Sequence, residues 1–354
     1  MVWGMRILLF CENKYSIGIL SPLQSEAARE RKHEVLWYVH TANIPEFPLE
    51  GEVRWTGSIQ EAYDFSPEAV FVPGNIVPYY LPGVKIQVFH GYAAEKKDHW
   101  VIRRYFDLYF TQGPYFTRGF RRLAGKYGDF EVVETGWPKQ DWIYGRLHDF
   151  DAEKAALLRK HGKKQVVLYA PTFSPSLTSL PFLEEALTDL VARRDIVLLL
   201  KFHPLTRQDW IEQYRQLAAE HDHIVWVDDY DITKYELMAD VMISDTSSTI
   251  YECLLLDKPV ITYGAVAKDI RWLDITDPAH LPEAFDRVQA EPAYAEMRRW
   301  VIENYDPYLD GKVCLRMLDA AQEWLDRNGV PRRRKLNLWR KYTSVKRFGR
   351  IKRR

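Results

Sequence analysis

The sequence predicts an α/β protein of two doubly wound domains, each a mostly parallel sheet covered by helices, followed by a basic tail. The chain has 354 residues, which suggests two domains at roughly 150 residues each. Short apolar runs alternate with segments of helical periodicity, as in βαβ units. The alternation stops between residues 137 and 150, among Gly136, Pro138 and Gly145, and then resumes. We therefore expect domains at residues 1–145 and 146–330 and a tail at 331–354.

The first domain opens with an apolar strand, a helix and a second strand. The helix is expected at residues 18–32, where Ile19, Leu23 and Ala27 fall on one side. Further apolar runs separated by helical patterns complete the sheet. The expected strands are residues 5–10, 35–39, 69–72, 84–89, 108–111 and 131–134.

The second domain repeats the alternation with longer helices. The expected strands are residues 165–170, 196–201, 224–227, 241–244 and 260–263. The expected helices are residues 151–161, 181–192, 207–220, 232–239, a segment that ends before Lys258-Pro259, 281–304 and 311–328. Doubly wound domains bind ligands at the carboxyl ends of their strands, so we expect these ends to face each other across a cleft.

The charge is unevenly distributed. Residues 331–354 hold 12 Lys or Arg and no acidic residue, which leaves 37 basic and 49 acidic residues in the body. An acidic body argues against a nucleic-acid partner. In the tail, apolar residues recur at helical spacing, as in basic amphipathic helices on membranes. The predicted contacts with an anionic membrane are Trp339, Arg340, Lys341, Lys346, Arg347 and Phe348. Nucleic-acid binding and a disordered tail are the alternatives.

The three cysteines, Cys11, Cys253 and Cys314, are too widely spaced for a disulfide framework or a metal motif, which favours a reducing compartment. The N-terminal stretch lacks the pattern of a signal peptide. No apolar run approaches the roughly 20 residues that span a bilayer. We expect a cytoplasmic protein associated peripherally with the inner face of the cell membrane.

Residues 239–263 show the clearest organisation. A buried strand at 241–244 is followed by Asp245, Thr246, Ser247 and Ser248, all good residues for a helix N-terminus. Unpaired backbone N–H groups and hydroxyls at such a turn suit a phosphate or diphosphate. The alternative is that these residues only cap the helix, since the helix dipole contributes about 0.3 to 1 kcal/mol to anion binding.

Polar residues also follow other strands. His90 comes directly after the strand at 84–89, where it is either a general base or a structural hydrogen-bonding group. Lys201 and His203 end the strand at 196–201 and would point the same way if the strand continues. Two further clusters, Pro171-Thr172 and Gly136-Trp137-Pro138-Lys139, end strands as well. Four such clusters together indicate function more strongly than any one of them.

A carboxylate metal site at Asp228, Asp229 and Asp231 is a further alternative, but Asp231 is better explained as a helix cap. We expect no tightly bound metal or other cofactor, and leave dependence on a divalent ion open.

Five ordered motifs together resemble those of the CDP-glycerol glycerophosphotransferase family, which builds teichoic-acid-like polymers. They are His90-Gly91, Gly136 to Asp141, Leu168 to Thr172, Lys201 to Pro204, and Asp240 to Ser248, with Asp310-Gly311 as a further short match. The resemblance implies a GT-B architecture, with a Rossmann-like acceptor-side domain at 1–145 and a Rossmann-like nucleotide-donor domain at 146–330.

The resemblance also implies roles for individual residues. His90 would be the catalytic base, and His203, Ser247 and Ser248 would hold the donor diphosphate, joined by Lys201, Asp245 and Thr246. Pro171 and Thr172 would line the nucleotide pocket, and Glu252 would contact the ribose region. Gly136, Pro138 and Lys139 would lie at the linker and cleft. The family often has other residues where this chain has Tyr92, Ser174 and Thr246.

The implied reaction moves a glycerol phosphate, or a related polyol phosphate, from a CDP-activated donor to a hydroxyl of a cell-envelope glycan or lipid-linked acceptor, with release of CMP. A glycosyltransferase that uses a nucleotide sugar is the main alternative. A UDP-sugar epimerase of similar fold is disfavoured, because the cleft motifs lack a matching set of carboxylates. The non-enzyme alternative is a nucleotide-binding scaffold at the membrane.

Overall fold

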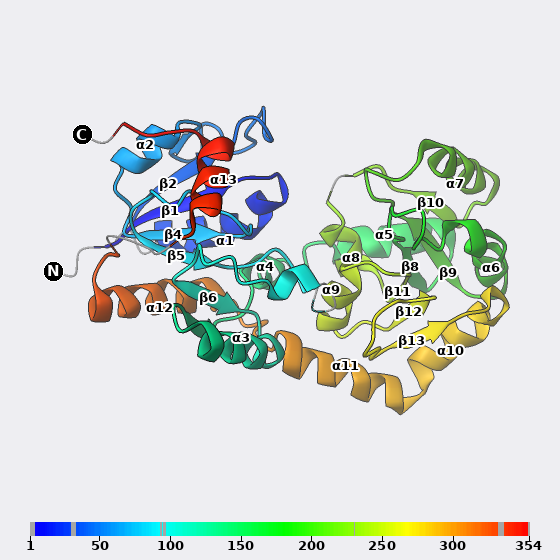
Figure 1. Cartoon of the computed structure of the whole chain (residues 1–354). Coiled ribbons are helices and arrows are strands. Elements are labelled where there is room, and N and C mark those ends of the chain that lie inside the picture. The colour runs from blue at the N-terminus through cyan, green and yellow to red at the C-terminus, as the bar shows by residue number, and fades with distance from the viewer. Residues whose placement is uncertain are drawn as a thin grey trace. The chain divides into compact units, whose positions relative to one another are not determined.

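Both predicted sheets are present and wholly parallel. The computed structural model describes residues 4–29, 33–92, 94, 97–229, 231–331 and 336–352. The chain divides into an N-terminal unit, formed by residues 1–145 and 306–354, and a C-terminal unit, formed by residues 146–305 (Figure 1).

The N-terminal unit is built on a seven-stranded sheet with the order β3-β2-β1-β4-β5-β6-β7. Strand β1 pairs on both sides, with Ile7 opposite Val35 and Ala69. Its residues after Arg6 are all buried, as expected for a strand covered on both faces. The strands are β1 (Arg6–Cys11), β2 (Glu34–Val39), β3 (Trp55–Thr56), β4 (Ala69–Val72), β5 (Val84–Gln87), β6 (Leu108–Thr111) and β7 (Glu131–Glu134).

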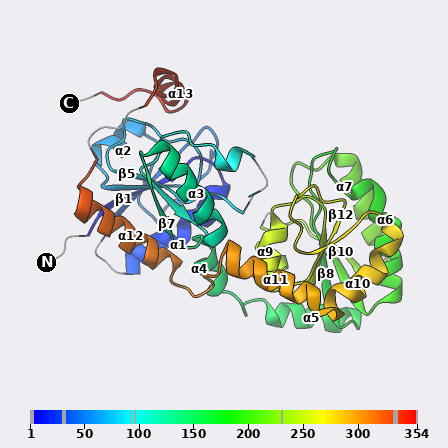
Figure 2. The same cartoon turned by 60° about the horizontal axis from the view of Figure 1, so that its bottom comes forward.

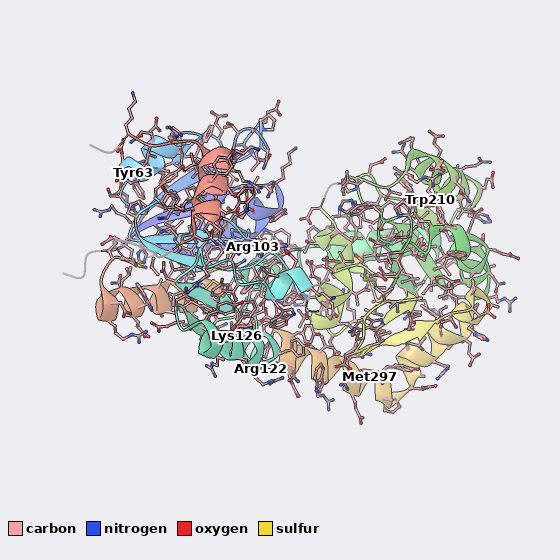
Figure 3. The ribbon with its side chains drawn as sticks, viewed as in Figure 1. Tyr63, Arg103, Arg122, Lys126, Trp210 and Met297 are labelled. Atoms are coloured by element: carbon pink, nitrogen blue, oxygen red, sulfur yellow. The ribbon has the colours of Figure 1, made fainter. Side chains whose placement is uncertain are left out.

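The helices of this unit follow local signals in the sequence. In α3 (Pro114–Tyr127), Pro114 occupies the first turn and Gly128 ends the helix in the left-handed conformation. The helix buries Phe116 and Phe120, whereas Arg122 and Lys126 extend from its exposed side (Figure 3). The other helices are α1 (Tyr15–Arg29), α2 (Ile59–Asp64), η1 (Lys97–Trp100), α4 (Lys139–Tyr144), α12 (Val313–Asn328) and α13 (Leu338–Phe348).

The C-terminal unit contains a six-stranded sheet with the order β10-β9-β8-β11-β12-β13. Its core joins Val167, Leu198 and Ile243 of three adjacent strands to Leu183 and Leu187 of α6. The strands are β8 (Gln165–Tyr169), β9 (Ile196–Leu200), β10 (Ile224–Trp226), β11 (Val241–Ser244), β12 (Val260–Tyr263) and β13 (Leu273–Ile275). The helices are α5 (Asp151–His161), α6 (Leu180–Arg193), α7 (Gln208–Glu220), α8 (Thr233–Met238), α9 (Thr249–Leu255), η2 (Pro278–His280), α10 (Leu281–Ala290) and α11 (Pro292–Tyr305).

The predicted domain limits were wrong for the last fifty residues. Residues 306–330 belong to the N-terminal unit, where α12 packs against α1 and α4. The Asp141 carboxylate of α4 accepts hydrogen bonds from the backbone N–H groups of Val313 and Cys314, at 2.9 and 2.7 Å, and so caps α12. The tail helix α13 is also part of this unit (Figure 2).

One helix prediction also needed correction. The single helix expected at 281–304 is two helices, α10 and α11, which separate at Glu291. Pro292 cannot donate the backbone hydrogen bond that would continue α10. The helix after Ser248 ends at Leu255, before Lys258-Pro259 as predicted, and Asp257 beyond it has a positive φ of 56°.

Candidate active site

The loop that carries His90 is strained and held from several sides. Phe89 has a φ of +61°, which costs a bulky residue about 1–3 kcal/mol, and Gly91 has a φ of +147°. The Trp137 indole Nε1 lies 3.4 Å from the Phe89 carbonyl oxygen, and Gln112 Nε2 donates to the Gly91 carbonyl at 2.7 Å. These contacts keep His90 exposed at the carboxyl edge of the sheet.

The His90 ring has a defined orientation. Its Nδ1 lies 3.3 Å from the carbonyl oxygen of Pro73. A carbonyl oxygen can only accept, so Nδ1 carries the hydrogen in this contact and Nε2 of the neutral ring carries the lone pair. The Tyr15 ring lies beside it, with 5.4 Å between the ring centroids. His90 is therefore arranged to take up a proton at Nε2.

Tyr92, which departs from the family pattern, is buried. Its hydroxyl donates to Asp306 Oδ2 at 2.8 Å and accepts from Gln140 Nε2 at 2.9 Å. The Asp306 carboxylate also accepts from the backbone N–H groups of Trp137 and Tyr308. Burial raises the pKa of Asp306 to about 8, although these hydrogen bonds oppose the rise. Sequence reasoning missed Asp306, whose only signal was an acid in an aromatic segment.

Gly136, Pro138 and Lys139, predicted at the linker and cleft, are packing residues of the N-terminal unit. Gly136 has a φ of +90°, and a Cβ there would lie 2.8 Å from Val313 and 2.9 Å from Tyr308. Pro138 is buried, and the Lys139 ammonium lies 5.8 Å from the Trp137 ring centroid. The segment is tightly packed because α12 passes directly against it.

In the C-terminal unit, Asp245 organises the loops rather than presenting a surface for the donor. It directly follows β11 and is fully buried. Its carboxylate accepts hydrogen bonds from Thr172 N at 2.8 Å, from Ser179 N at 2.8 Å and Ser179 Oγ at 2.9 Å, and from Thr246 N. Burial raises the pKa of Asp245, and these four donors oppose the rise. The prediction that Asp245 contacts the nucleotide-activated substrate directly was therefore wrong.

His203 is exposed after the end of β9. Its ring stacks on Phe173 with 4.4 Å between centroids, and its Nδ1 accepts from Leu205 N at 3.1 Å. The neutral ring therefore carries its hydrogen on Nε2, which can donate to an anion. Burial, and then the charge of Lys201, lower the pKa of His203.

Lys201 does not share a face with His203, contrary to the prediction. β9 ends at Leu200, so the alternation of a strand does not extend to these residues. Lys201 is buried and its ammonium donates to the Phe202 carbonyl at 3.0 Å. Burial lowers its pKa, while the charges of Asp229, Asp231 and Asp228 raise it.

The hydroxyl residues before α9 are accessible. Ser247 Oγ lies 2.8 Å from Thr249 Oγ1 and accepts weakly from Thr249 N, whereas Ser248 is exposed and its side chain makes no capping bond. Thr246, Thr172 and Glu252 are partly exposed, and Pro171 is buried. Because β9, β8 and β11 are adjacent in the sheet, His203, Thr172 and Ser248 follow neighbouring strand ends.

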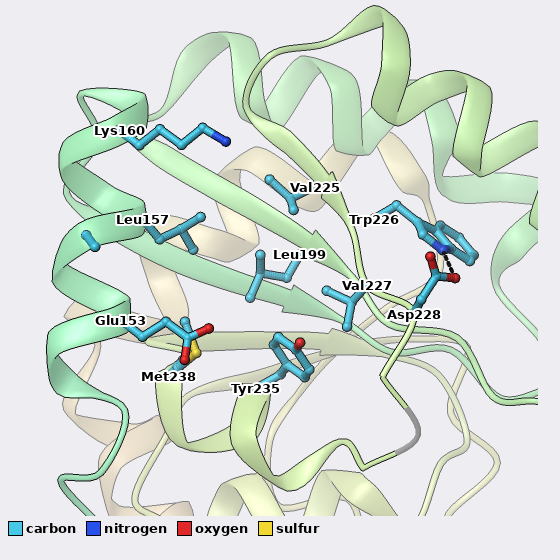
Figure 4. A pocket seen from close by; sticks show the side chains of 11 residues that line it. Glu153, Leu157, Lys160, Leu199, Val225, Trp226, Val227, Asp228, Tyr235 and Met238 are labelled. Carbon is cyan, nitrogen blue, oxygen red and sulfur yellow. Dashed lines mark hydrogen bonds between the residues drawn. The ribbon is translucent and has the colours of Figure 1, made fainter.

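A cavity of about 370 Å³ in the C-terminal unit lies elsewhere, between α5, α8 and the strands β9 and β10 (Figure 4). Its walls include Leu157, Leu199, Val225 and Met238, and the set contains no residue of the predicted site. Asp231, weighed above as a metal ligand, accepts from Thr233 N at 3.0 Å and Thr233 Oγ1 at 2.8 Å beside the start of α8. Within the described residues, no group of three His, Cys, Asp or Glu is placed to hold a metal.

The profile of the family described as CDP-Glycerol:Poly(glycerophosphate) glycerophosphotransferase matches residues 82–270, which is more than half of the chain. The chain belongs to this family. The chain is 28% identical over 171 residues to the teichoic acid glycerol-phosphate primase of Bacillus subtilis (strain 168), an alignment that covers 46% of this chain and 42% of the primase.

It is also 28% identical over 227 residues to the teichoic acid ribitol-phosphate primase of Bacillus spizizenii (strain ATCC 23059 / NRRL B-14472 / W23), covering 54% of each chain. The chain thus spans about half the length of these relatives. Its fold is similar to that of the wall teichoic acid polymerase TagF, with a TM-score of 0.65, 18% identity and coverage of 91% of this chain and 90% of that one.

A second similar structure is the S. aureus MnaA-UDP complex, with a TM-score of 0.65, 15% identity and coverage of 91% of this chain and 97% of that one. These likenesses confirm the predicted GT-B architecture of two Rossmann-like domains.

Proposed function

We propose that this glycerophosphotransferase moves a glycerol phosphate, or a related polyol phosphate, from a CDP-activated donor to a hydroxyl of a cell-envelope glycan or lipid-linked acceptor. The observation that carries the proposal is the strained loop at Phe89–Gly91, which holds His90 at the carboxyl edge of the sheet with its Nδ1 beside the Pro73 carbonyl. Strain of this kind is retained where function requires a fixed side chain. The names of the relatives, which include glycerol-phosphate and ribitol-phosphate primases, support the choice of group.

In the proposed reaction, an acceptor hydroxyl attacks the glycerol-bearing phosphorus while His90 Nε2 takes its proton. A new phosphorus–oxygen bond forms to the acceptor, and the bond to the bridging oxygen of the diphosphate breaks, releasing CMP. A positioned base contributes about 10² to 10⁴ in rate. Positioned hydrogen-bond donors stabilise the charge that grows on the departing phosphate.

We assign these donors to His203 and to the hydroxyls of Ser247 and Ser248, with Thr172 and Glu252 beside the nucleoside. Support comes from the Leu205 N–H, which fixes the His203 hydrogen on Nε2, and from the exposure of Ser248. We assign Lys201 an indirect role, because its buried ammonium interacts electrostatically with the loop that carries Asp228, Asp229 and Asp231. The proposal requires no tightly bound metal.

We also propose that the enzyme is cytoplasmic and binds the inner face of the cell membrane through the first half of α13. Leu338, Trp339 and Tyr342 are 82, 74 and 58% exposed on this helix, among Arg340, Lys341 and Lys346. Each basic residue near an anionic leaflet contributes about 1 kcal/mol. Among the described helices, none has the length and apolar character needed to cross a membrane.

The membrane prediction was wrong for Phe348. This side chain is 6% exposed and lies in the core of the N-terminal unit. It packs against Phe10 with 5.2 Å between ring centroids. The apolar stripe of the tail is thus divided, its end packed on protein and its start exposed.

The test is a thermal-stability screen with CDP-glycerol, CDP-ribitol, CMP, UDP-sugars and GDP-sugars, followed by CMP release with the best donor. A ligand at 100 times its Kd stabilises a protein by about 2.7 kcal/mol. Selective stabilisation by cytidine nucleotides, weakened in His203→Gln, supports the proposal. Selective stabilisation by UDP-sugars or GDP-sugars contradicts it and favours a glycosyltransferase.

A further inference from the structure

Helix α13 is fixed to the N-terminal unit along its second half. Tyr79 N donates to the buried hydroxyl of Ser344 at 3.2 Å, and the Tyr80 hydroxyl donates to the Gly349 carbonyl at 2.7 Å. After the helix, Gln60 exchanges two hydrogen bonds with the backbone of Lys352, at 2.7 and 3.1 Å. These bonds, with the burial of Phe348, make α13 a built-in element of the unit.

Arg347 extends from this helix to the carboxyl edge of the sheet. Its guanidinium pairs with Glu12, which directly follows β1 and whose side chain is only 5% exposed. His40 directly follows β2, and its Nε2 lies 3.3 Å from the carbonyl oxygen of Arg347. The same residue of α13 therefore contacts the ends of two neighbouring strands.

Glu12 lies within a group of polar side chains beside His90. A Cβ built on Gly74 would be 3.2 Å from Glu12 Oε2 and 3.9 Å from the Tyr15 hydroxyl, so both oxygens flank the same narrow space. Asn13 Nδ2 donates to the Tyr15 hydroxyl at 3.2 Å, and the Tyr15 ring lies 5.4 Å from that of His90. Glu12, the partner of Arg347, and Tyr15 thus both border Gly74, and the Tyr15 ring lies beside the proposed base.

The pair with Arg347 matters because Glu12 is buried. Burial raises the pKa of Glu12, and the charge of Arg347 is the largest opposing influence. The Arg347 side chain is 41% exposed, so its loss mainly affects the buried Glu12 carboxylate, which is left uncompensated and rearranges or becomes neutral. Loss of Arg347 should therefore disturb the edge around Tyr15, far from Arg347 in sequence.

We propose that Arg347 is a positioning residue of the acceptor site, which pairs with Glu12 and fixes the polar edge where the acceptor hydroxyl meets His90. The tail helix then serves acceptor use directly, in addition to membrane contact. This inference rests on the proposed function, because it takes His90 as the base and the N-terminal unit as the acceptor side.

The test uses the full chain, CDP-glycerol and a water-soluble acceptor that ends in a glycerol phosphate, without membranes. Arg347→Gln should raise the KM for the acceptor about tenfold and leave the KM for the donor unchanged, which corresponds to the loss of one charge-assisted contact. Arg347→Lys keeps the charge and should recover part of the loss. Arg350→Gln removes an exposed charge three residues away and should behave like the wild type.

A double-mutant cycle separates this role from loose attachment of α13. Glu12→Gln changes no residue of the helix, yet it should raise the acceptor KM as Arg347→Gln does, and the double variant should be no worse than either. A normal acceptor KM in both single variants, while His90→Gln abolishes turnover, overturns the inference and leaves the proposed function standing. Wild-type protein that releases no CMP defeats the proposed function itself.

Discussion

The carboxyl edges of the two sheets hold their candidate residues in different ways. In the C-terminal unit, one buried carboxylate, Asp245, ties the end of β11 to the loop after the neighbouring strand β8. In the N-terminal unit, the His90 loop is held by Trp137, and by Asp306 through Tyr92, 214 residues away in sequence. The edge of the C-terminal unit is thus built from one continuous segment. The edge of the N-terminal unit is completed by residues from 306 onward, where the returning chain rejoins this unit.

The two edges also differ in chemistry. Each edge presents a histidine whose Nδ1 is engaged by backbone, but the partner differs. The Pro73 carbonyl accepts from His90 and leaves a lone pair on Nε2, whereas the Leu205 N–H donates to His203 and leaves a hydrogen there. One edge therefore offers a proton acceptor and the other a proton donor. The backbone contact alone assigns these opposite roles to the same residue type.

The largest expected effect comes from removing each of these two histidines in turn. His90→Gln should lower the rate of CMP release by about 10² to 10⁴ while the Kd for CDP-glycerol stays unchanged. His203→Gln should weaken donor binding as well as turnover, because it removes a donor to the diphosphate. Calorimetric titration and CMP release measure the two quantities. His148→Gln, an 88% exposed side chain, is the matched control. Equal donor affinity in all three variants would contradict the division of roles.

The sequence predicted most strands because buried parallel strands are short apolar runs bounded by polar residues. It also predicted which strand ends carry His90, His203 and the hydroxyls of residues 246–248. It could not predict that Lys201 is buried, because the direction of that side chain depends on where β9 stops. Asp306 and Arg347 were missed as partners of the N-terminal edge, since only the fold brings them there. Glu12, which directly follows the first strand, could have been found by the reasoning applied to His90.

Gly136 tests how tightly the returning chain is packed. Gly136→Ala must place a Cβ 2.8 Å from Val313 at a φ of +90°, so it should destabilise the N-terminal unit by about 2–4 kcal/mol through backbone strain and overpacking. Gly128→Ala has a φ of +66° but no atom within 4 Å of its Cβ, and should cost only about 1 kcal/mol. Urea unfolding of both variants gives the difference. Equal costs would mean that the α12 segment yields easily.

Asp245 tests the other edge. Asp245→Asn replaces a carboxylate oxygen by an amide nitrogen facing N–H and O–H donors, which should cost about 1–3 kcal/mol. The loss should be local, seen as faster hydrogen exchange in residues 171–180 and weaker binding of CDP-glycerol. Asp195→Asn, an exposed carboxylate paired with Lys164, should change stability by less than about 1 kcal/mol. Unchanged exchange in residues 171–180 would show that Asp245 does not organise that loop.

The pH dependence of stability that comes from Asp306 tests the N-terminal edge in a second way. Burial raises the pKa of this acid from 3.8 to about 8, so the unfolded chain releases its proton at lower pH than the folded one. The folded state is then favoured below the unfolded pKa, and this contribution declines as pH rises from about 4 to about 8, by at most about 1.4 kcal/mol per unit. Asp306→Asn has no titratable group at this position. Its free energy of unfolding should therefore rise relative to that of the wild type across this pH window, and the difference should stay constant above it. Urea unfolding at pH 5, 6.5, 8 and 9 measures the gap. A constant gap from pH 5 to 8 would mean that Tyr92 and the backbone N–H groups of Trp137 and Tyr308 keep Asp306 ionised, making the edge completed by the returning chain a charged one like that around Asp245.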